Sequence, residues 1–561
     1  MKRIILPVLV LAACARHERP GLVLHEPADL VFRKGVVMTL DARQPRAEAV
    51  AVAGGRIVYV GSEQGIEEWI GPQTDVVDLA GGTLLPGFQD SHIHLVGGGL
   101  RLDACQLGSF TTREEILAEI RRYAEAHPDR PWILGGGWAL PAFPQANPHK
   151  SLLDAIVPDR PVALSAADGH SVWVNSRALE LARITKETPD PPNGRIERDA
   201  TGEPTGTLRE SAAQLLATVV PKRSPQEYAD GLRKALKLAA ESGITSIQDA
   251  SARSEELEAY AALDRSGELT VRVTAALRAG PEKGLDQIPE FIRQRATYRG
   301  KRLRAETVKI FVDGVIEART AALLEPYVGS DDRGHPNWEP EALDQMVAAL
   351  DREGFQIHVH AIGDHAVRLA LDAFEKARAA NGPRDARHQI AHLELIDPQD
   401  IPRFQSLGVI ADFQPLWAWD DPYINDLTVP VLGPERSRWL YPIGAVAKTG
   451  AVVVGGSDWP VTSMYPPAAI QIGITRRDPA AGPGPAWLPE HTVDLQTLLA
   501  AYTIQGAFAA FQEKTTGSIE AGKLADLVVL DKDITQVPAH EIAGVKVVRT
   551  FMEGKEVWPS Q

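Results

Sequence analysis

The middle of this chain alternates short apolar strands with helical stretches, and this alternation constrains the fold more than any other feature. Two of the helical stretches, residues 227–243 and 341–354, end in glycine, a common helix stop. Alternation of this kind implies parallel strands joined by right-handed crossovers. Eight such strands predict an α/β fold, a TIM-type (β/α)8 barrel, with an open doubly wound sheet as the alternative. The expected strands are TLLPGFQDSHIH (83–94), GITSIQDA (243–250), LTVRVTAALR (269–278), TVKIFVDG (307–314), FQIHVHAI (355–362), HQIAHLEL (388–395), GVIADFQP (408–415) and AVVVGGSDWP (451–460).

The two ends of the chain share a different pattern, in which short β-branched runs are separated by turns. Residues 29–62 and 524–558 both show it, and both contain the segment ADLV. We expect one composite β-sandwich domain made from residues 28–82 and 514–561, with two unrelated small sheets as the alternative. The barrel would then occupy residues 83–513.

A long segment separates the first two barrel strands. The distance from His94 to Gly243 is far greater than a βα loop requires, and the segment is rich in tryptophan, glycine and polar residues. We expect an insertion at about residues 100–225, built over the mouth of the barrel, where loops usually supply substrate contacts.

The first residues have the composition of an export signal. In residues 1–13, Lys2 and Arg3 precede an apolar stretch that is far below the ~20 residues needed to span a bilayer. We expect a signal peptide here and exclude it from the fold.

The end of this signal, LAAC, resembles a bacterial lipobox. That resemblance implies lipidation of Cys14, a lipidated tether over residues 14–27 and, because Ala15 and Arg16 follow in place of aspartate, a location on the periplasmic face of the outer membrane. An ordinary signal with a chance cysteine is the alternative. Cys105 then has no partner, so no intrachain disulfide is expected.

The charge balance argues against one class of partner. The 561 residues carry a net charge of −15 and have a pI near 5.5, whereas nucleic-acid binding requires a basic face. The hydrophobic share of 44% is that of an ordinary soluble enzyme. Composition leaves the oligomeric state open.

Metal-ligating side chains fall at the carboxyl ends of several expected strands. The first strand ends in two histidines at alternate positions, which share one face of a strand. Imidazole and carboxylate ligands suit zinc, and a bound ion lowers the pKa of water toward ~7. The pattern therefore predicts metal-dependent hydrolysis. The residues at this rim are His92, His94, Lys309, His358, His360, His392 and Asp458.

Lys309 lies in an apolar strand, where an unpaired ammonium is costly. A second ion about 3.5–4 Å from the first would need a bridging carboxylate, and lysine has no acceptor of its own. A lysine with a lowered pKa can add carbon dioxide and become a carbamate, which supplies two anionic oxygens. The alternative is an uncarboxylated Lys309 paired with Asp313, beside a single metal.

These residues and the motifs around them resemble the amidohydrolase superfamily, and more closely its YtcJ-like branch, which includes N-substituted formamide deformylases. The motifs are weak singly and specific jointly, and they run in order through nearly the whole mature chain. They are PGFQDSHIH, WILGGGW, DGHSVWVNSRAL, GITSIQDA, VKIFVDG, HAIGDHAV, RHQIAHLELI, GSDWPV and GSIEAGKLADLVVLD.

The resemblance implies two zinc ions. His92 and His94 would bind the more buried ion, and His360 and His392 the more exposed one, with carboxylated Lys309 as the bridge between them. His360 is preferred because HAIGD is the matching motif. His358, two residues earlier on the same face, remains a competitor.

The resemblance also implies that Asp458 touches the metal centre and acts as general base. In this role Asp458 helps a metal-activated hydroxide to form and then passes the proton to the leaving nitrogen. We therefore expect an amidohydrolase that cleaves non-peptide C–N bonds, most simply amides, in small-molecule substrates. The alternatives are a phosphotriesterase-like hydrolase, a deaminase, and a catalytically silent ligand-binding lipoprotein.

Several residues in the insertion have two interpretations. His170 could orient the substrate carbonyl or the oxyanion, or it could be an exposed loop histidine. Trp138 and Trp173 could wall an apolar substrate pocket, or they could pack beneath the insertion. Asn175, and Asp364 in the barrel, are expected to be cap or loop residues.

Overall fold

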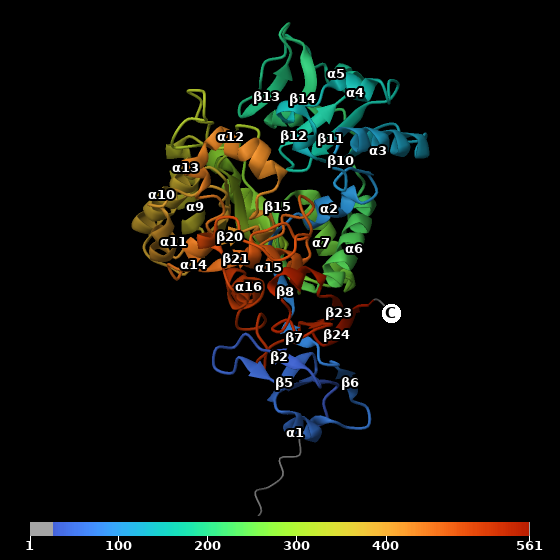
Figure 1. Ribbon diagram of the computed structural model, residues 1–561, viewed down its shortest axis with the longest axis vertical. Helices are drawn as coiled ribbons and strands as arrows, with labels where there is room; N and C mark the ends of the chain where they lie inside the picture. Colours follow the sequence, from blue (N-terminus) through green and yellow to red (C-terminus); the bar gives the residue numbers. More distant parts are fainter. Residues whose placement is uncertain (1–25, 560–561) are drawn as a thin grey trace, which may run out of the picture.

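The computed structural model describes residues 26–559 and shows three parts stacked along the long axis of the molecule. A β-domain lies at one end, the barrel in the middle and an insertion at the other end (Figure 1). The export signal, and residues 14–25 of the expected tether with Cys14, lie outside the described residues.

The barrel is one sheet of eight parallel strands, as the alternating sequence pattern predicts. The two edge strands meet and close it, because the backbone N–H of Asp458 donates to the carbonyl of His92 at 2.7 Å, and that of His94 donates to Trp459 at 2.9 Å. The strands in spatial order are β21 (Val453–Gly455), β20 (Ile410–Phe413), β19 (Gln389–His392), β18 (Gln356–Ala361), β17 (Leu303–Phe311), β16 (Arg272–Arg278), β15 (Ile244–Ala252) and β8 (Phe88–Ile93).

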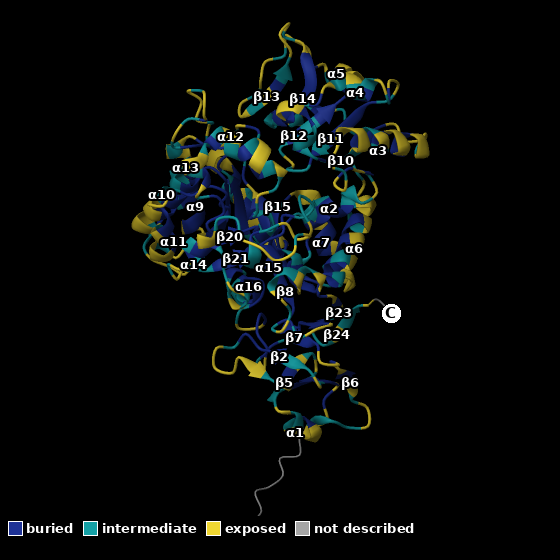
Figure 2. Ribbon diagram, in the orientation of Figure 1, coloured by how far each residue is buried: buried dark blue, intermediate teal, exposed yellow. Residues whose placement is uncertain are grey.

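Helices surround the strands and bury them in one apolar core (Figure 2). The helix predicted at 227–243 is α6 (Pro225–Glu241), which starts with a capping box between Ser224 and Glu227. The helix predicted at 341–354 is α9 (Pro340–Arg352). Gly243 and Gly354 follow them in left-handed conformations, at φ 77° and 79°, which explains why glycine ends both helices. The other helices are α2 (Leu95–Arg101), α7 (Ser254–Ser266), α8 (Ile288–Thr297), α10 (Asp364–Asn381), α11 (Ile401–Leu407), α12 (Val429–Leu432), α13 (Pro434–Ser437), α14 (Ile443–Ala447), α15 (Pro466–Thr475), α16 (Leu495–Ala501) and α17 (Ile504–Ala509).

Both chain ends contribute to the β-domain beneath the barrel. The pairing that joins them is antiparallel, between β7 (Thr83–Pro86) and β22 (Leu527–Leu530), and places Leu84 opposite Val529. Side chains from both ends share one core, which includes Phe32 and Phe551 with ring centroids 5.0 Å apart. One sheet has the order β5 (Arg56–Gly61), β4 (Ala49–Ala53), β1 (Leu30–Arg33), β6 (Asp75–Asp78); the other has β24 (Lys555–Trp558), β23 (Val547–Met552), β22, β7, β2 (Val36–Met38), β3 (Arg46–Ala47), and the short helix α1 (Glu63–Ile66) follows β5.

The segment between α2 and α6 forms a six-stranded sheet with its own apolar core. It lies above the end of the barrel that is opposite the β-domain (Figure 1). Its strands, in spatial order, are β13 (Gly194–Arg198), β14 (Pro204–Glu210), β12 (Ser171–Val174), β11 (Val162–Ala166), β10 (Ile133–Trp138) and β9 (Cys105–Gln106), and its helices are α3 (Arg113–Ala126), α4 (Lys150–Asp154) and α5 (Ser176–Ala182).

Within residues 26–559, no helix combines the length and the apolar character that crossing a bilayer requires.

A buried ion pair joins the barrel to the β-domain and gives a test of their packing. Arg272, at the start of β16, donates from Nε to Asp526 Oδ2 at 2.7 Å and from Nη2 to Glu553 Oε1 at 3.0 Å. Asp526→Ala would leave this guanidinium buried with one partner fewer, so we expect the free energy of unfolding to fall by about 3–5 kcal/mol in urea titrations followed by tryptophan fluorescence.

The matched control is Glu180→Ala, which removes the exposed partner of Arg177. We expect that change to cost less than about 1 kcal/mol. Equal losses in the two variants would show that the Arg272–Asp526 pair does not hold the two parts together.

Candidate metal centre

Two histidines of the first barrel strand point toward the centre of the carboxyl-end rim. His92 lies within β8, and His94 is the first residue after the strand and the N-cap of α2. Their ring centroids are 5.5 Å apart. The alternate spacing in the sequence therefore places both imidazoles at one site, with His92 buried and His94 partly exposed.

Histidines from β18 and β19 meet His92 at this rim. His92 Nδ1 lies 3.0 Å from His358 Nε2, and the His92 ring is 4.6 Å from that of His392. The rings of His360 and His392 are 4.4 Å apart. Three strands, β8, β18 and β19, thus bring imidazoles together from segments remote in the sequence. Burial lowers the pKa of each of the four histidines His92, His358, His360 and His392, so that all are neutral and able to bind a cation.

Asp458 lies among these rings, three residues after β21. Its Oδ1 atom is 3.1 Å from His94 Nε2 and 3.5 Å from His92 Nε2, and Oδ2 is 4.0 Å from His392 Nδ1. The residue has a left-handed backbone with φ 52°, which an aspartate tolerates better than most side chains. This turn aims the carboxylate back into the barrel.

Lys309 reaches the same site from β17. It is completely buried, and its Nζ atom has no hydrogen-bond partner among the described residues. Burial lowers its pKa to about 7, although the charges of Asp458 and Asp412 act in the opposite direction. The alternative pairing with Asp313 is absent, because the Asp313 carboxylate accepts from the backbone N–H groups of Ala322, Ile362 and Gly363.

Asp412, which lies in β20, was not among the site residues expected from the sequence. Its Oδ2 atom is 3.5 Å from His358 Nε2 and 3.9 Å from His92 Nδ1, and has no hydrogen-bond partner within residues 26–559. Burial raises its pKa well above the usual value. The signal was available, since an aspartate inside the apolar strand GVIADFQP is costly without a function or a partner.

The residues present fit a divalent metal ion. Two groups have ligand atoms that all lie within 4.8 Å of one another: His92, His392 and Asp458 form one, and His92, His358 and Asp412 form the other. Buried polar atoms without partners concentrate here, which is the condition that a bound cation would relieve. These atoms are Lys309 Nζ, His358 Nδ1, Asp412 Oδ2 and Asp458 Oδ1.

His358 and His360 occupy different positions in this arrangement. His358 belongs to one of the two candidate groups, whereas His360 belongs to neither. His360 Nε2 instead donates to the carbonyl of Gly314 at 3.0 Å, so the other ring nitrogen, Nδ1, is the one available to a metal ion. The preference for His360 as a ligand therefore stays a prediction, and His358 is its geometric competitor.

The insertion brings one histidine to the metal side of the rim. The ring of His170 lies 5.1 Å from that of His360, and Nδ1 is 2.9 Å from Glu210 Oε2. Burial alone would lower the pKa of His170, but the Glu210 carboxylate offsets this effect and raises the pKa to about 9. His170 is thus a protonated imidazolium held by Glu210, a partner that the sequence analysis did not identify.

The other residues singled out from the sequence have structural roles. Trp138 and Trp173 are fully buried in the insertion core, with ring centroids 6.3 Å apart, so the packing interpretation applies and neither ring is exposed to the barrel mouth. Asn175 caps α5 by accepting from Ala178 N at 3.0 Å. Asp364, at the start of α10, accepts from Leu324 N at 2.9 Å. Cys105 is buried and free, as expected.

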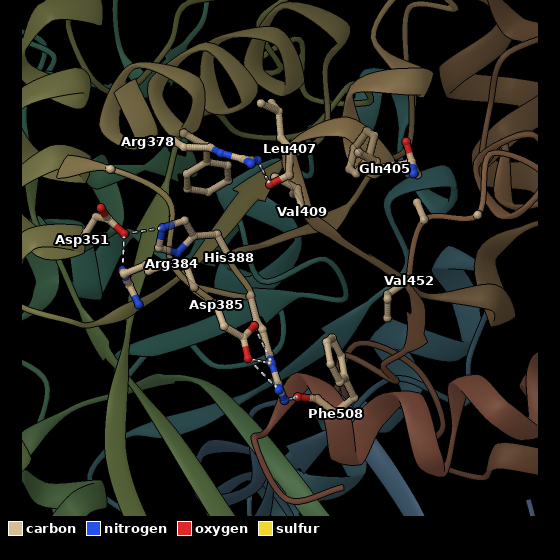
Figure 3. A pocket seen from close by; sticks show the side chains of 18 residues that line it. Asp351, Arg378, Arg384, Asp385, His388, Gln405, Leu407, Val409, Val452 and Phe508 are labelled. Carbon is tan, nitrogen blue, oxygen red and sulfur yellow. Dashed lines mark hydrogen bonds and ion pairs between the residues drawn. The ribbon is translucent and has the colours of Figure 1, made fainter. Parts of the chain in front are cut away.

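A cavity of about 330 Å³ lies at the opposite end of the barrel, beside the amino ends of β19, β20 and β21 (Figure 3). Its charged groups are already paired: His388 Nε2 lies 3.2 Å from Asp351 Oδ1, and Arg384 Nε donates to the same oxygen at 2.6 Å. In (β/α)8 enzymes this end maintains stability, and the carboxyl end carries the chemistry. The cavity is therefore separate from the metal site.

The family model described as "Amidohydrolase family" matches residues 75–558. The chain belongs to this family. The resemblance read from the sequence motifs is confirmed, and the rim holds a candidate metal site.

Several curated proteins are similar to this amidohydrolase over most of its length. The protein LONG AFTER FAR-RED 3 of Arabidopsis thaliana is 32% identical and covers 95% of this chain and 92% of its own. The putative amidohydrolase YtcJ of Bacillus subtilis is 30% identical, with 94% and 99% covered. The N-substituted formamide deformylase of Arthrobacter pascens is 29% identical, with 94% and 97% covered.

Two solved structures share the fold. An uncharacterized metal-dependent hydrolase from Pyrococcus horikoshii aligns with a TM-score of 0.70 at 26% identity, covering 91% of this chain and 99% of its own. One from Pyrococcus furiosus aligns with a TM-score of 0.68 at 26% identity, covering 90% and 99%. Both matches support a place for this chain among the metal-dependent hydrolases.

His92 is the residue common to both candidate metal groups, which makes it the most sensitive test of the site. We expect His92→Ala to lose most of the bound metal, measured by plasma mass spectrometry after loading with zinc and gel filtration. The control is His540→Ala, in the β-domain, which should keep the metal content of the unchanged protein. If both variants hold equal amounts of metal, the ion binds elsewhere.

Proposed function

We propose that this amidohydrolase cleaves non-peptide C–N bonds, most simply amide bonds of small molecules. One observation carries the proposal: His92, His392 and Asp458 bring three ligand atoms within 4.8 Å of one another, beside a buried lysine that has no partner. The N-substituted formamide deformylase among the relatives is named for an amide substrate, which supports the bond type.

The proposed ligands are those expected from the sequence. His92 and His94 would hold one ion, His360 and His392 a second, and Asp458 would face both. Lys309, as a carbamate, would supply a bridge between the ions; its burial and its lowered pKa favour the neutral amine that adds carbon dioxide. Ions bound here, most simply zinc, would lower the pKa of water toward ~7 and polarise the substrate carbonyl.

Asp458 is positioned to move the proton. Its Oδ1 atom has no hydrogen-bond donor of its own among the described residues, so it is free to accept a proton from the attacking water. His94 Nε2 lies 3.1 Å from this oxygen without forming a hydrogen bond to it. The same oxygen then delivers the proton to the leaving nitrogen as the C–N bond breaks.

His170 is positioned to stabilise negative charge on the carbonyl oxygen. Glu210 occupies its Nδ1 atom at 2.9 Å, so Nε2–H is the donor that remains. The raised pKa of His170 keeps its imidazole protonated at neutral pH, and this positive charge would stabilise a developing oxyanion. Export and lipid attachment at Cys14 remain part of the proposal on the sequence alone.

Asp458→Asn gives the central test of the mechanism. We expect kcat to fall by about 10²–10⁴ on any amide that is hydrolysed, because the amide side chain cannot accept the proton, while the metal content stays nearly intact. Asp420→Asn, at an exposed neighbouring position of the rim loops, is the control and should retain activity.

The substrate panel separates the competing functions. It includes N-substituted formamides and acetamides, phosphotriesters and aminopurines. Turnover of the phosphotriesters would indicate a phosphotriesterase, and turnover of the aminopurines a deaminase. If the Asp458→Asn variant is active, Asp458 is not the general base. Bound metal without turnover of any substrate would favour a binding protein.

Lys309→Met tests the bridge. A protein with a carbamate should hold about two ions per chain and show a ¹³C-carbamate signal after exchange with ¹³C-bicarbonate. We expect the methionine variant to lose the signal and at least one ion. One ion per chain and no carbamate signal in the unchanged protein would establish a single-metal site.

A further inference from the structure

Two guanidinium groups at the carboxyl end of the barrel have no anionic partner. Arg278 is the last residue of β16, and Arg101 is the last residue of α2. Within residues 26–559, neither side chain takes part in an ion pair or a hydrogen bond, although Arg278 lies over the ring of Phe311. Other described arginines, such as Arg304, also lack such partners, so the location of Arg101 and Arg278 at the rim is what distinguishes them.

Arg278 lies directly beside the metal-side residues. It is the registered neighbour of Lys309 across the sheet, so both side chains leave the same face of the strands. The Arg278 Cζ atom lies 5.1 Å from the centroid of the Phe311 ring, Lys309 Nζ lies 4.9 Å from that centroid, and the ring is 5.2 Å from that of His360. Arg278 is exposed although the residue before it is buried. Its charge therefore lines the open end of the barrel.

Arg101 reaches the rim from α2. A Cβ atom on Gly98 would meet the Trp459 ring at 2.1 Å, so this face of the helix packs on the residue next to Asp458. Arg101 follows Gly98 by three residues and lies on the same face. The charges that act on its guanidinium are those of Asp458 in the barrel and Asp168 in the insertion. Arg101 thus lies between the two parts, above the proposed general base.

Acidic side chains lie on both sides of the rim, and Glu256, Glu282 and Glu210 act electrostatically on Arg278 without pairing with it. Glu317 accepts from Thr428 Oγ1 at 2.7 Å, and Glu394, two residues after His392, is 2% exposed with no partner for Oε1. Asp421 acts electrostatically on Glu394 and follows β20, which is four strands away from β16 in the eight-stranded barrel. Burial raises the pKa of Glu317 and of Glu394, which disfavours their anionic forms, and Arg278 and Arg101 remain without an anionic partner.

The unpaired guanidinium groups define what the open end can bind. A guanidinium without an anionic partner gains most from a carboxylate, whose two oxygens match its donors. A carboxylate on the substrate would thus fix which end of the molecule faces Arg278.

We propose that the substrate carries a carboxylate in addition to the bond that is cleaved, and that Arg278, supported by Arg101, binds this carboxylate. The inference rests on the proposed amide hydrolysis for the bond, and on the two unpaired arginines for the carboxylate. It narrows the substrate class from amides in general to anionic amides.

Matched pairs of acid and carboxamide give the test. The probes are N-formylphenylalanine and 4-(formamidomethyl)benzoate, each compared with its carboxamide, as substrates of the metal-loaded protein. We expect kcat/KM to be at least about tenfold higher for the acids, with most of the difference in KM. Arg278→Gln should lower kcat/KM by about 10- to 100-fold for the acids and change it little for the carboxamides. Arg278→Lys should restore part of the loss.

Arg304→Gln is the matched control. Arg304 is an exposed arginine without an ion pair near the amino end of the neighbouring strand β17, on the far side of the barrel from the rim. We expect the Arg304→Gln variant to prefer the acids over the carboxamides as strongly as the unchanged protein does. Arg101→Gln should reduce the preference in the same direction as Arg278→Gln. Equal rates for acids and carboxamides, or a preference that survives both rim variants, would overturn the inference.

A binding arm separates this inference from the proposed function. Calorimetric titration with phenylacetate and with phenylacetamide measures recognition without turnover. If no amide is hydrolysed but phenylacetate binds more tightly and Arg278→Gln abolishes the difference, the carboxylate site stands and the amide function fails. If amides are hydrolysed with no acid preference and phenylacetate has no advantage, the function stands and the carboxylate site is wrong.

Discussion

The closure of the barrel between β21 and β8 is the constraint on which the site depends. The backbone hydrogen bond from Asp458 to His92, at 2.7 Å, joins the last strand to the first across more than three hundred residues of chain. It sets the aspartate beside the two histidines of β8, and the strands between them supply Lys309 and His392. Without closure these side chains would lie along an open edge, and no set of ligand atoms would converge.

The converged groups are kept reactive by their surroundings. The barrel core excludes water, so that the pKa of the buried lysine falls to about 7 and the buried imidazoles are neutral, and Oδ2 of the buried aspartate on β20 has no donor among the described residues. A fold without a function here would be expected to replace such groups with apolar side chains, because each carries a desolvation cost. The insertion adds the opposite kind of group, the His170–Glu210 pair, whose charge is retained. The site therefore combines neutral ligands below with charged groups above.

The strand order and both glycine-ended helices could be read from the sequence because each is a local pattern. The pairing of β7 with β22 was suggested only by composition, and the structure supplies the register. Asp412 was missed because a single aspartate in a strand has no periodicity, and Glu210 because its partner His170 lies 40 residues away. Trp138 and Trp173 could equally have lined a pocket or filled a core, and burial decided for the core.

The sequence alone determined the kinds of side chain available and the strand on which each lies, because hydrophobic alternation and glycine stops act over a few residues. It also determined membership of the amidohydrolase family, through motifs that keep their order along the chain. Only the tertiary structure decided which atoms meet: the group of His92, His358 and Asp412, and the place of Arg278 beside Lys309 at the rim. The physical reason is that distances of 3–5 Å between groups on different strands depend on barrel closure and side-chain packing, which no local pattern encodes.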